Sequence, residues 1–537
     1  MRIIMTDKLP QISRRPDVCL ISALVLGSVV LAVSFLGENL YRDVAYCYAY
    51  AVREAALYGN WDYVLDPGLP VLCMISAVPF ALCGLEASRA LMLTCGLFWI
   101  ATVFPLYFLL KRFISPAAAS VGTVLFILAP KLIRFSCAGL VEAPRNFFLV
   151  SAFVTLFELT ECGKLRNVFF FALSLAGLAT ARAEGFVISG VFLLLLFGNR
   201  IWLMRNSFSP RKLFRPFLLC CAAAGFFLLL LSPKLIYNYK KTGYPTIDTR
   251  YNPYLNALVR FDRFAILPAD YPPPRPVTES SAAYRNSTSF PWKENSKAAF
   301  TNTVRGAYEL YFIPGLLGLL CCIFRFSRPF KSTRQKVPEI VRNGWRMEYT
   351  DALIIVFFHE ILYFTDCSAY RYYTFLIPLM LPFTMLAFSW LWNAAAVVPA
   401  RFRPRMWLVL AGCVLAGMQL RNGLGFFFSA GYERRAGSFL RVHSRDFRKG
   451  RTGRTRIYVG YPEVAYYSGF EYANSSLNSK SRKLTARENE FDLAVFEKES
   501  DKWKEFAQEH GLVEWTGHPH SKIMRILIPE RKAGVLP

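Results

Sequence analysis

Residues 18–43 have the sequence VCLISALVLGSVVLAVSFLGENLYRD, in which an apolar run from Val18 to Leu36 ends shortly before Arg42 and Asp43. A run of this length can cross the roughly 30 Å of hydrocarbon in a bilayer as a helix. Arg14 and Arg15 precede the run and no convincing small-residue cleavage site follows it, which indicates an uncleaved signal anchor with a cytoplasmic N-terminus. Asp43 then lies just beyond the membrane, on the extracytoplasmic side.

Similar apolar runs recur as far as Phe428, in a chain of 537 residues that is 54% hydrophobic and has a mean hydropathy of +0.30. The sequence therefore predicts an all-α polytopic transmembrane protein. We expect about 11 spans, at 18–36, 88–110, 117–135, 144–160, 167–182, 184–199, 217–236, 307–325, 351–365, 372–392 and 406–428. Residues 67–84 contain Pro70 and Pro79, and they are predicted to form an interfacial or re-entrant helix that does not cross.

The net charge of +26 does not predict nucleic-acid binding, because the Lys and Arg residues lie mostly in short connections between spans. Alternation of the spans puts five basic clusters on the cytoplasmic side, as the positive-inside rule requires. These clusters are Lys111-Arg112, Lys164 with Arg166, Arg200 to Arg215, Arg325 to Arg342, and Arg401 to Arg405. If residues 67–84 did cross, every later side would invert.

Two polar stretches lie outside the spans. Residues 237–306 form a large outer loop, too long for an ordinary connection, which is either a lid or a disordered loop. After a transmembrane module over 1–431, residues 432–537 alternate strand-like runs with a charged helical stretch, which predicts a small extracytoplasmic α/β domain.

Ionisable residues gather on the predicted extracytoplasmic face, which is typical of a membrane protein that carries out chemistry there. They include Asp43 in the first outer loop (37–87), the segment Arg134 to Glu142, Arg182 with Glu184, Lys234, and Asp366 with Arg371. A carboxylate can take a proton from an attacking hydroxyl, and Arg or Lys can stabilise a departing phosphate. This mixture favours transfer from a phosphate-activated donor.

The chain resembles the GT-C integral-membrane glycosyltransferases over roughly residues 18–392. The branch it is similar to holds the protein O-mannosyltransferases and the bacterial lipid A aminoarabinose transferase. The resemblance is carried by Asp43-Val-Ala-Tyr-Cys-Tyr, Ala129-Pro130 with Phe135-Ser136 and Glu142, Thr180-Ala-Arg-Ala-Glu-Gly185, Ser232-Pro-Lys-Leu-Ile-Tyr-Asn238 with Gly243, and Arg371-Tyr-Tyr-Thr-Phe-Leu-Ile-Pro378.

The resemblance implies a polyprenyl-phosphate sugar as donor and an inverting displacement on the extracytoplasmic face, with Asp43 as base. Val44 stands where the family often has a second acid, so Glu142 is the candidate second carboxylate. The candidate donor-phosphate ligands are Arg371, Arg182 and Lys234, and the candidate substrate contacts are Arg42, Glu184 and Tyr46. No cofactor is certain. A divalent cation held by Asp43 and Glu142 is left open, since such sites usually need more oxygen ligands.

Structural roles are open for the same residues. Glu142 could pair with Arg134 or Arg145, and Arg182 and Glu184 could form a structural ion pair across a tight turn. Arg371 could be an interfacial anchor, and Lys234 could extend to the membrane interface.

Two other functions are open: a transporter or flippase of a lipid-linked anionic substrate, and a non-catalytic membrane scaffold. A transporter should show polar residues in broken helices at mid-membrane, and few are visible. Under the leading hypothesis, the acceptor is an envelope lipid, protein or glycan, and the expected location is a bacterial inner or plasma membrane.

Overall fold

In the computed structural model, the residues described are 18–37, 44, 48–65, 70–162, 164–182, 184–204, 210–242, 301, 305, 311–318, 370–397, 404–428, 440, 456–459, 471–472, 493–497, 504, 507–508, 512–514 and 524–529. Asp43, Arg42 and Tyr46 lie outside these residues, as do the predicted span 351–365 and most of 307–325. Residues 243–300 of the large outer loop also lie outside them.

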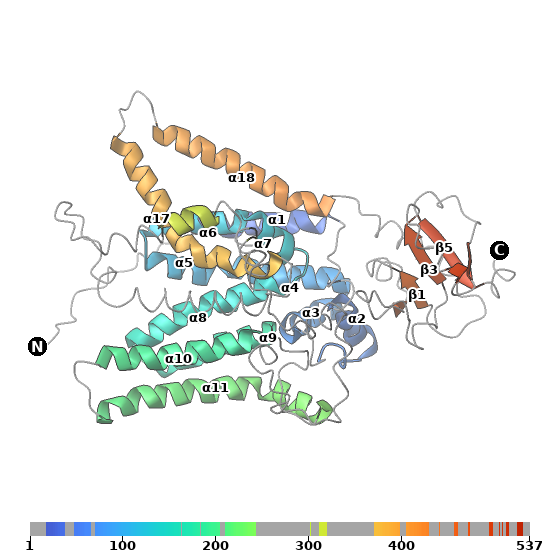
Figure 1. The fold of residues 1–537 in the computed structure, drawn as a ribbon, viewed down its shortest axis with the longest axis horizontal. Coiled ribbons are helices and arrows are strands. Elements are labelled where there is room, and N and C mark those ends of the chain that lie inside the picture. Colours follow the sequence, from blue (N-terminus) through green and yellow to red (C-terminus); the bar gives the residue numbers. More distant parts are fainter. Residues whose placement is uncertain are drawn as a thin grey trace, which may run out of the picture.

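The described part of the chain is mainly a body of helices (Figure 1). In chain order they are α1 (Val18–Phe35), α2 (Ala49–Tyr58), α3 (Val71–Leu82), α4 (Ala87–Ala101), α5 (Val103–Lys111), α6 (Pro116–Leu128), α7 (Pro130–Ser136), α8 (Glu142–Cys162), α9 (Leu165–Ala181), α10 (Glu184–Met204), α11 (Pro210–Thr242), the 3₁₀ helix η4 (Tyr370–Phe375), α17 (Leu376–Val397) and α18 (Pro404–Phe428). Helices α2 and α3 lie together at one end of this body, and α10 ends and α11 begins at the opposite end (Figure 1).

Several of these helices are long and apolar enough to cross a membrane. Ala87–Lys111, Phe217–Lys240 and Arg405–Phe428 each meet this condition alone, and α6 with α7 meets it as a bent pair. Helices of the predicted spans between 144 and 199 are present as α8, α9 and α10. The total of eleven spans stays a prediction. Helix α3 has 12 residues, a rise of about 18 Å, which is too short to cross.

The predicted span 117–135 is not one straight helix. It is bent by 57° between α6 and α7, where Ala129 has an extended backbone and Pro130 opens the second helix. Proline has no N–H to continue the hydrogen bonds of the preceding helix, and it disfavours helical geometry in the residue before it. The break ends α7 at Ser136, a short connection before α8 begins.

Helix α8 lies against α4, α5, α9 and α10 in the interior of the body. Phe153 of α8 and Phe171 of α9 both pack against Phe192 of α10, with ring centroids 4.9 and 6.4 Å apart. At Gly177 of α9, an added Cβ would overlap the ring of Phe148, so this glycine lets α8 and α9 approach closely. The three helices are therefore fixed relative to one another, and so are their ends.

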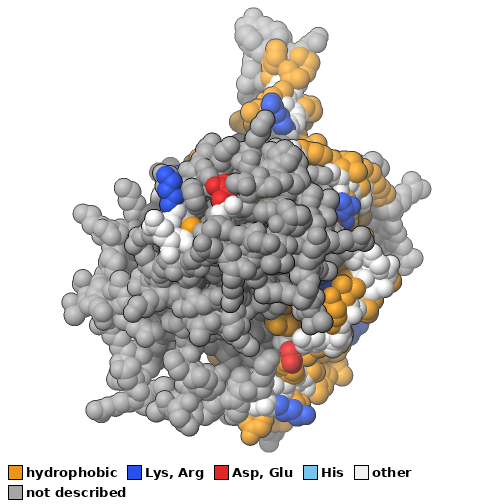
Figure 2. Space-filling model, turned by 90° about the vertical axis from the view of Figure 1, so that its right-hand side faces the viewer, with side chains coloured by type: hydrophobic (Ala, Val, Ile, Leu, Met, Phe, Trp, Pro, Cys, Tyr) orange, Lys and Arg blue, Asp and Glu red, His pale blue; other side chains and the backbone are white. Residues whose placement is uncertain are grey.

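Apolar side chains remain exposed on the flanks of the body, as expected for helices that face lipid. Helix α18 exposes Trp407, Val409, Leu410, Val414 and Met418. Viewed from the end that carries α2 and α3, hydrophobic side chains lie along one flank with Lys and Arg side chains among them (Figure 2).

Five strands form a mixed sheet near the C-terminus: β1 (Arg456–Val459), β2 (Glu471–Tyr472), β3 (Leu493–Glu497), β4 (Leu512–Glu514) and β5 (Met524–Pro529). Their order is β2-β1-β3-β5-β4, with β1 parallel to β2 and β3, and β5 antiparallel to β3 and β4. Strands β1, β3 and β5 coincide with the strand-like runs in the sequence. A complete α/β domain over 432–537 stays a prediction.

Candidate functional site

Three helix ends meet at the candidate site. Glu142 is the first residue of α8, Arg182 follows the last residue of α9, and Glu184 is the first residue of α10. Carboxylates at the first residue of a helix are stabilised by the partial positive charge of that helix end. The sequence therefore places two acids where the helix ends favour negative charge, with an arginine between them.

Two glycines allow these ends to come together. Gly139, in the connection before α8, has φ +82°, a conformation that other residues rarely adopt. Gly185 donates its backbone N–H to the Arg182 carbonyl at 3.0 Å, which closes the turn between α9 and α10. A Cβ at residue 185 would overlap the Leu178 carbonyl oxygen, so the turn requires glycine.

Four charged side chains form a connected network, which we call the ion cluster: Glu142, Arg145, Arg182 and Glu184. The Arg182 guanidinium donates to Glu142 Oε1 from Nη1 at 3.3 Å and pairs with Glu184 through Nε. Arg145 Nη1 lies 3.6 Å from Glu184 Oε1. Arg182 thus links the two carboxylates, which belong to different helices.

The ion cluster is buried and balanced in charge. The side chains of Glu142, Arg145 and Glu184 are 1%, 1% and 2% exposed, and Arg182 is the most accessible at 14%. Two carboxylates face two guanidinium groups, which limits the cost of burying charge as long as all four are present. Arg182 is therefore the member of the cluster that a ligand can reach first.

Helix η4 closes one side of the ion cluster. The Arg145 guanidinium carbon lies 5.3 Å from the centroid of the Phe375 ring, the last residue of η4. Arg371 belongs to the same short helix, which packs against α8. The backbone thus brings the segment of this predicted phosphate ligand to the cluster, and its side chain lies outside the described residues.

Lys234, on α11, contacts the segment that follows α2. Its Nζ donates to the Leu65 carbonyl oxygen at 3.1 Å, and one turn later the Tyr237 hydroxyl donates to Asp62 Oδ1 at 2.9 Å. Residues 62–65 follow α2, so these bonds place this part of α11 at the α2 and α3 end of the body. Asp62 was not among the predicted site residues.

The sequence-predicted residues thus have different outcomes. Glu142, Arg182 and Glu184 are brought together, and Lys234 is buried against the segment that follows α2. The predicted Arg182–Glu184 pair is present, and Arg145 pairs with Glu184. A pairing of Glu142 with Arg134 or Arg145 stays a prediction. Arg134 lies over the Phe426 ring.

Asn146 was missed by the sequence analysis. It lies one helical turn after Glu142, its side chain is 1% exposed, and neither its amide oxygen nor its amide nitrogen has a hydrogen-bond partner among the described residues. The only signal in the sequence is its spacing of four residues from Glu142, which puts both on the same face of α8.

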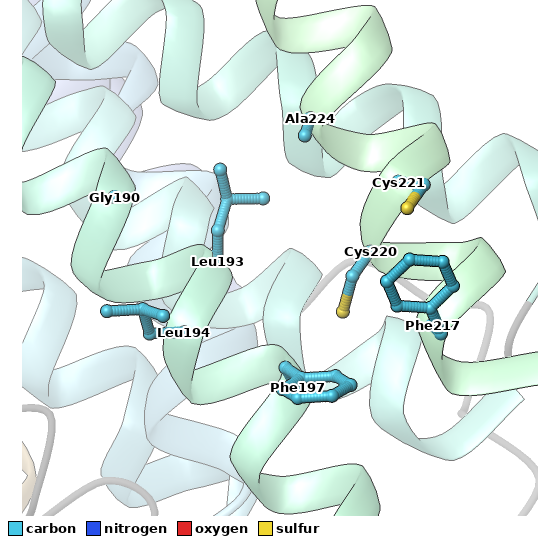
Figure 3. Close-up of a pocket in the computed structure, with 8 residues that line it drawn as sticks. All are labelled: Gly190, Leu193, Leu194, Phe197, Phe217, Cys220, Cys221 and Ala224. Atoms are coloured by element: carbon cyan, nitrogen blue, oxygen red, sulfur yellow. The ribbon is translucent and has the colours of Figure 1, made fainter. Parts of the chain in front are cut away.

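An open apolar crevice of about 510 Å³ lies between α10 and α11. It is lined by Gly190, Leu193, Leu194, Phe197, Phe217, Cys220, Cys221 and Ala224. Leu193 and Phe197 of α10 lie opposite Cys220 and Phe217 of α11 (Figure 3). None of the described residues that line the crevice is charged, so it suits a hydrocarbon chain.

Other reactive groups near the cluster do not make a catalytic centre by themselves. Burial raises the pKa of the Cys137 thiol to about 12, so this residue stays protonated and is a poor nucleophile at neutral pH. Within the described ranges, no three His, Cys, Asp or Glu side chains are arranged to hold a metal ion.

Comparison with known proteins gives structural relatives only. No family model matches the sequence, and no curated protein matches it. ArnT from Cupriavidus metallidurans, solved with bound undecaprenyl phosphate, is 11% identical over 95% of this chain and 97% of its own, with a TM-score of 0.58. The same protein in its apo state gives 12% identity, coverage of 96% and 98%, and a TM-score of 0.54.

The oligosaccharyltransferase AglB from Archaeoglobus fulgidus is also similar. Its complex with an inhibitory peptide and a dolichol-phosphate is 12% identical, covers 91% of this chain and 70% of its own, and has a TM-score of 0.52. Its complex with Zn and sulfate gives 13% identity, coverage of 91% and 69%, and a TM-score of 0.53. At these identities, the likeness is one of fold.

Proposed function

We propose that this chain, whose fold is that of the GT-C membrane glycosyltransferases predicted from its sequence, transfers a sugar from a polyprenyl-phosphate donor. The ion cluster carries this proposal, because it places two carboxylates and two guanidinium groups together where the ends of α8, α9 and α10 meet. The acceptor is a hydroxyl or phosphate of an envelope lipid, protein or glycan on the extracytoplasmic face.

The arginines of the cluster supply charge for the leaving group. When the sugar–phosphate bond breaks, the polyprenyl phosphate departs as an anion, which needs positive charge and no general acid. Arg182 is partly exposed and already links both carboxylates, so we assign it to the phosphate. Lys234 and Arg371 are the other candidates, from α11 and from the 3₁₀ helix that packs against α8.

The base in this proposal is Asp43. A carboxylate on the far side of the anomeric carbon from the phosphate would take the proton of the acceptor hydroxyl, and the displacement would invert the anomeric configuration. Glu142 is held by Arg182 at 3.3 Å, which suits it to orienting the substrate and the arginine. Glu184, bonded to both arginines, fixes their positions.

A metal ion does not fit the described part of the cluster. The AglB structure holds Zn, but in this chain Oε1 of Glu142 accepts from a guanidinium group, and both carboxylates of the ion cluster pair with arginines. A cation at Glu142 would require ligands from outside the described residues, such as Asp43. We therefore assign no step to a metal, and metal dependence remains part of the test.

The apolar features support a lipid-linked donor. The neighbouring folds were solved with dolichol-phosphate and undecaprenyl phosphate. In this chain the crevice begins at Gly190, six residues or about 9 Å along α10 from Glu184. A lipid whose phosphate lies at the ion cluster could therefore place its hydrocarbon chain against α10.

The test is glycosyl transfer by purified protein in lipid vesicles, from radiolabelled polyprenyl-phosphate sugars into envelope extract, with and without chelator. We expect transfer by the wild type and loss of about 10²- to 10⁴-fold in Asp43→Asn. Glu158→Gln, at the far end of α8, is the control and should transfer normally. Full transfer by Asp43→Asn would exclude this base, and lack of turnover by folded wild type with every donor would favour lipid transport or a scaffold role.

A further inference from the structure

Asn146 is a buried, uncharged polar side chain beside the ion cluster. Its amide is buried in the first turns of α8, directly after Arg145 and one turn from Glu142. Among the residues that the structure describes, neither of its polar atoms makes a hydrogen bond. The nearby charged side chains all have partners.

A buried amide without a partner is unfavourable for folding. Leaving a buried donor or acceptor unpaired costs roughly 1–3 kcal/mol, and a carboxamide has both. An apolar residue of the same size would avoid that cost. A buried polar group without a partner calls for an explanation, and a bound ligand is one. The position of Asn146 beside Glu142 and Arg145 would put that ligand at the proposed site.

The hydrogen-bonding groups of the amide indicate which part of a polyprenyl-phosphate sugar it would bind. A phosphate offers acceptors only, and would leave the amide oxygen unpaired. An ammonium group offers donors only, and would leave the amide nitrogen unpaired. A sugar hydroxyl both donates and accepts, so a hydroxyl, or a vicinal pair, satisfies both atoms.

We infer that Asn146 is a sugar-binding residue that hydrogen-bonds hydroxyls of a neutral donor sugar. The inference rests on the proposed function and narrows its substrate class. The balanced charge of the ion cluster agrees with it, because the two carboxylates are already paired with arginines and are poorly placed to compensate a cationic amino sugar. Asn146 contributes selectivity for the sugar, and the arginines contribute affinity for the phosphate.

The experiment measures binding of three lipids to the full-length protein in vesicles: polyprenyl phosphate, a polyprenyl-phosphate neutral hexose, and a polyprenyl-phosphate 4-amino sugar. We expect the wild type to bind the neutral donor most tightly. Asn146→Leu should weaken that binding about tenfold and change binding of polyprenyl phosphate less than twofold. Asn146→Ala serves as a second variant should the larger side chain disturb folding.

Thermal unfolding without lipid separates this role from a structural one. Because the amide has no partner to lose, Asn146→Leu should unfold at the wild-type temperature or above it. The control is Asn167→Leu, which removes a buried amide that donates to the Glu158 carbonyl at 3.2 Å, and it should lower the unfolding temperature with no change in sugar preference.

Three results would overturn the inference: equal loss of binding for all three lipids, unchanged binding of the neutral donor, or a lowered unfolding temperature for both Asn146 variants.

Failure of the proposed function would give different results. If the neutral donor binds through Asn146 and no sugar is transferred, the sugar site stands and the transferase proposal falls. If sugar is transferred and Asn146→Leu matches the wild type in transfer and binding, only the inference falls.

Discussion

The two ends of one helix, α10, show how differently this molecule treats polar and apolar chemistry. At its first residue, Glu184 lies in a buried network with Arg145 and Arg182, and each charge has a partner from another part of the chain. Two turns further along, Gly190 opens a crevice whose described lining consists of apolar side chains, cysteines and glycine. Among the described residues, the buried charges of α8 and α10 thus lie in the first turn of each helix.

This difference separates two tasks that a lipid-linked donor would impose. The ion cluster can recognise a charged and hydroxylated headgroup, whereas the crevice can only accommodate hydrocarbon. Changes in the cluster should therefore alter chemistry and folding together, and changes in the crevice should alter only the preference among lipids.

The largest effect is expected for Arg182→Met, which leaves two buried carboxylates without their shared partner. Breaking a buried pair typically costs 3–5 kcal/mol, so the unfolding temperature should fall sharply, and transfer should fall by about 10³-fold. Thermal unfolding and radiolabel transfer measure the two effects.

Arg166→Met, on an exposed position at the other end of α9, is the matched control for Arg182→Met. It should leave both measurements unchanged. A stable and active Arg182→Met protein would show that the cluster is not where the chemistry occurs.

Glu142→Gln should give the next largest effect. It removes the charge of this side chain and keeps its shape. The amide keeps the size of the side chain but weakens its bond to Arg182, so we expect transfer to fall about 100-fold with a smaller loss of stability than for Arg182→Met. Glu158→Gln, on the same helix, provides the baseline. Equal losses of stability in the Glu142 and Arg182 variants would indicate that Glu142 is purely structural.

Lys234→Met tests whether the cation on α11 belongs to the phosphate site. Loss of a phosphate contact should raise the KM for donor about tenfold, and kcat should be nearly unchanged. Lys240→Met changes an exposed lysine of the same helix and should have no effect. An unchanged KM in Lys234→Met would exclude a role in binding the phosphate and favour a structural role, such as its bond to the Leu65 carbonyl.

Gly190→Leu should give the smallest effect, and it tests the apolar crevice instead of the ion cluster. A Cβ at this position meets nothing within 4 Å, and leucine is a better helix former than glycine by up to about 1 kcal/mol, so stability should rise slightly. Transfer from long-chain donors should fall about threefold relative to short-chain donors if hydrocarbon occupies the crevice.

Gly198→Leu is the matched control. Gly198 also lies on α10 with open space around it but outside the crevice, so the leucine should stabilise the helix without filling the crevice. If the two variants showed the same preference among donor lengths, the crevice would have no role in binding the donor.

Much of the fold could be predicted because a membrane makes the sequence pattern simple. Apolar runs bounded by charge became α4 with α5, α8, α9 and α10 close to the expected limits, whereas α11 (Pro210–Thr242) extends beyond both ends of the predicted span 217–236. The bend at Pro130 was not predicted, because a proline within an apolar run does not show by itself whether neighbouring helices can accommodate a break.

The acids and arginines of the candidate site could be predicted from the sequence, but most of the ion pairs between them could not. Arg182 and Glu184 are two residues apart, so their pairing could be considered from sequence. The pairing of Arg145 with Glu184, and of Arg182 with Glu142, depends on how α8 packs against α9 and α10. Asn146 was missed because the lack of a hydrogen-bond partner is a property of the folded protein and not of a residue type.

Gly185 carries a consequence for the evolution of this chain. Since any side chain there would overlap the Leu178 carbonyl, no single substitution can be accepted without moving the first turn of α10 and Glu184 with it. Relatives that preserve the turn should therefore retain this glycine even where the surrounding apolar residues have diverged completely. An arginine, an acid and a glycine in the order Arg-x-Glu-Gly, directly after an apolar helix, would then identify distant members that overall identity no longer reveals.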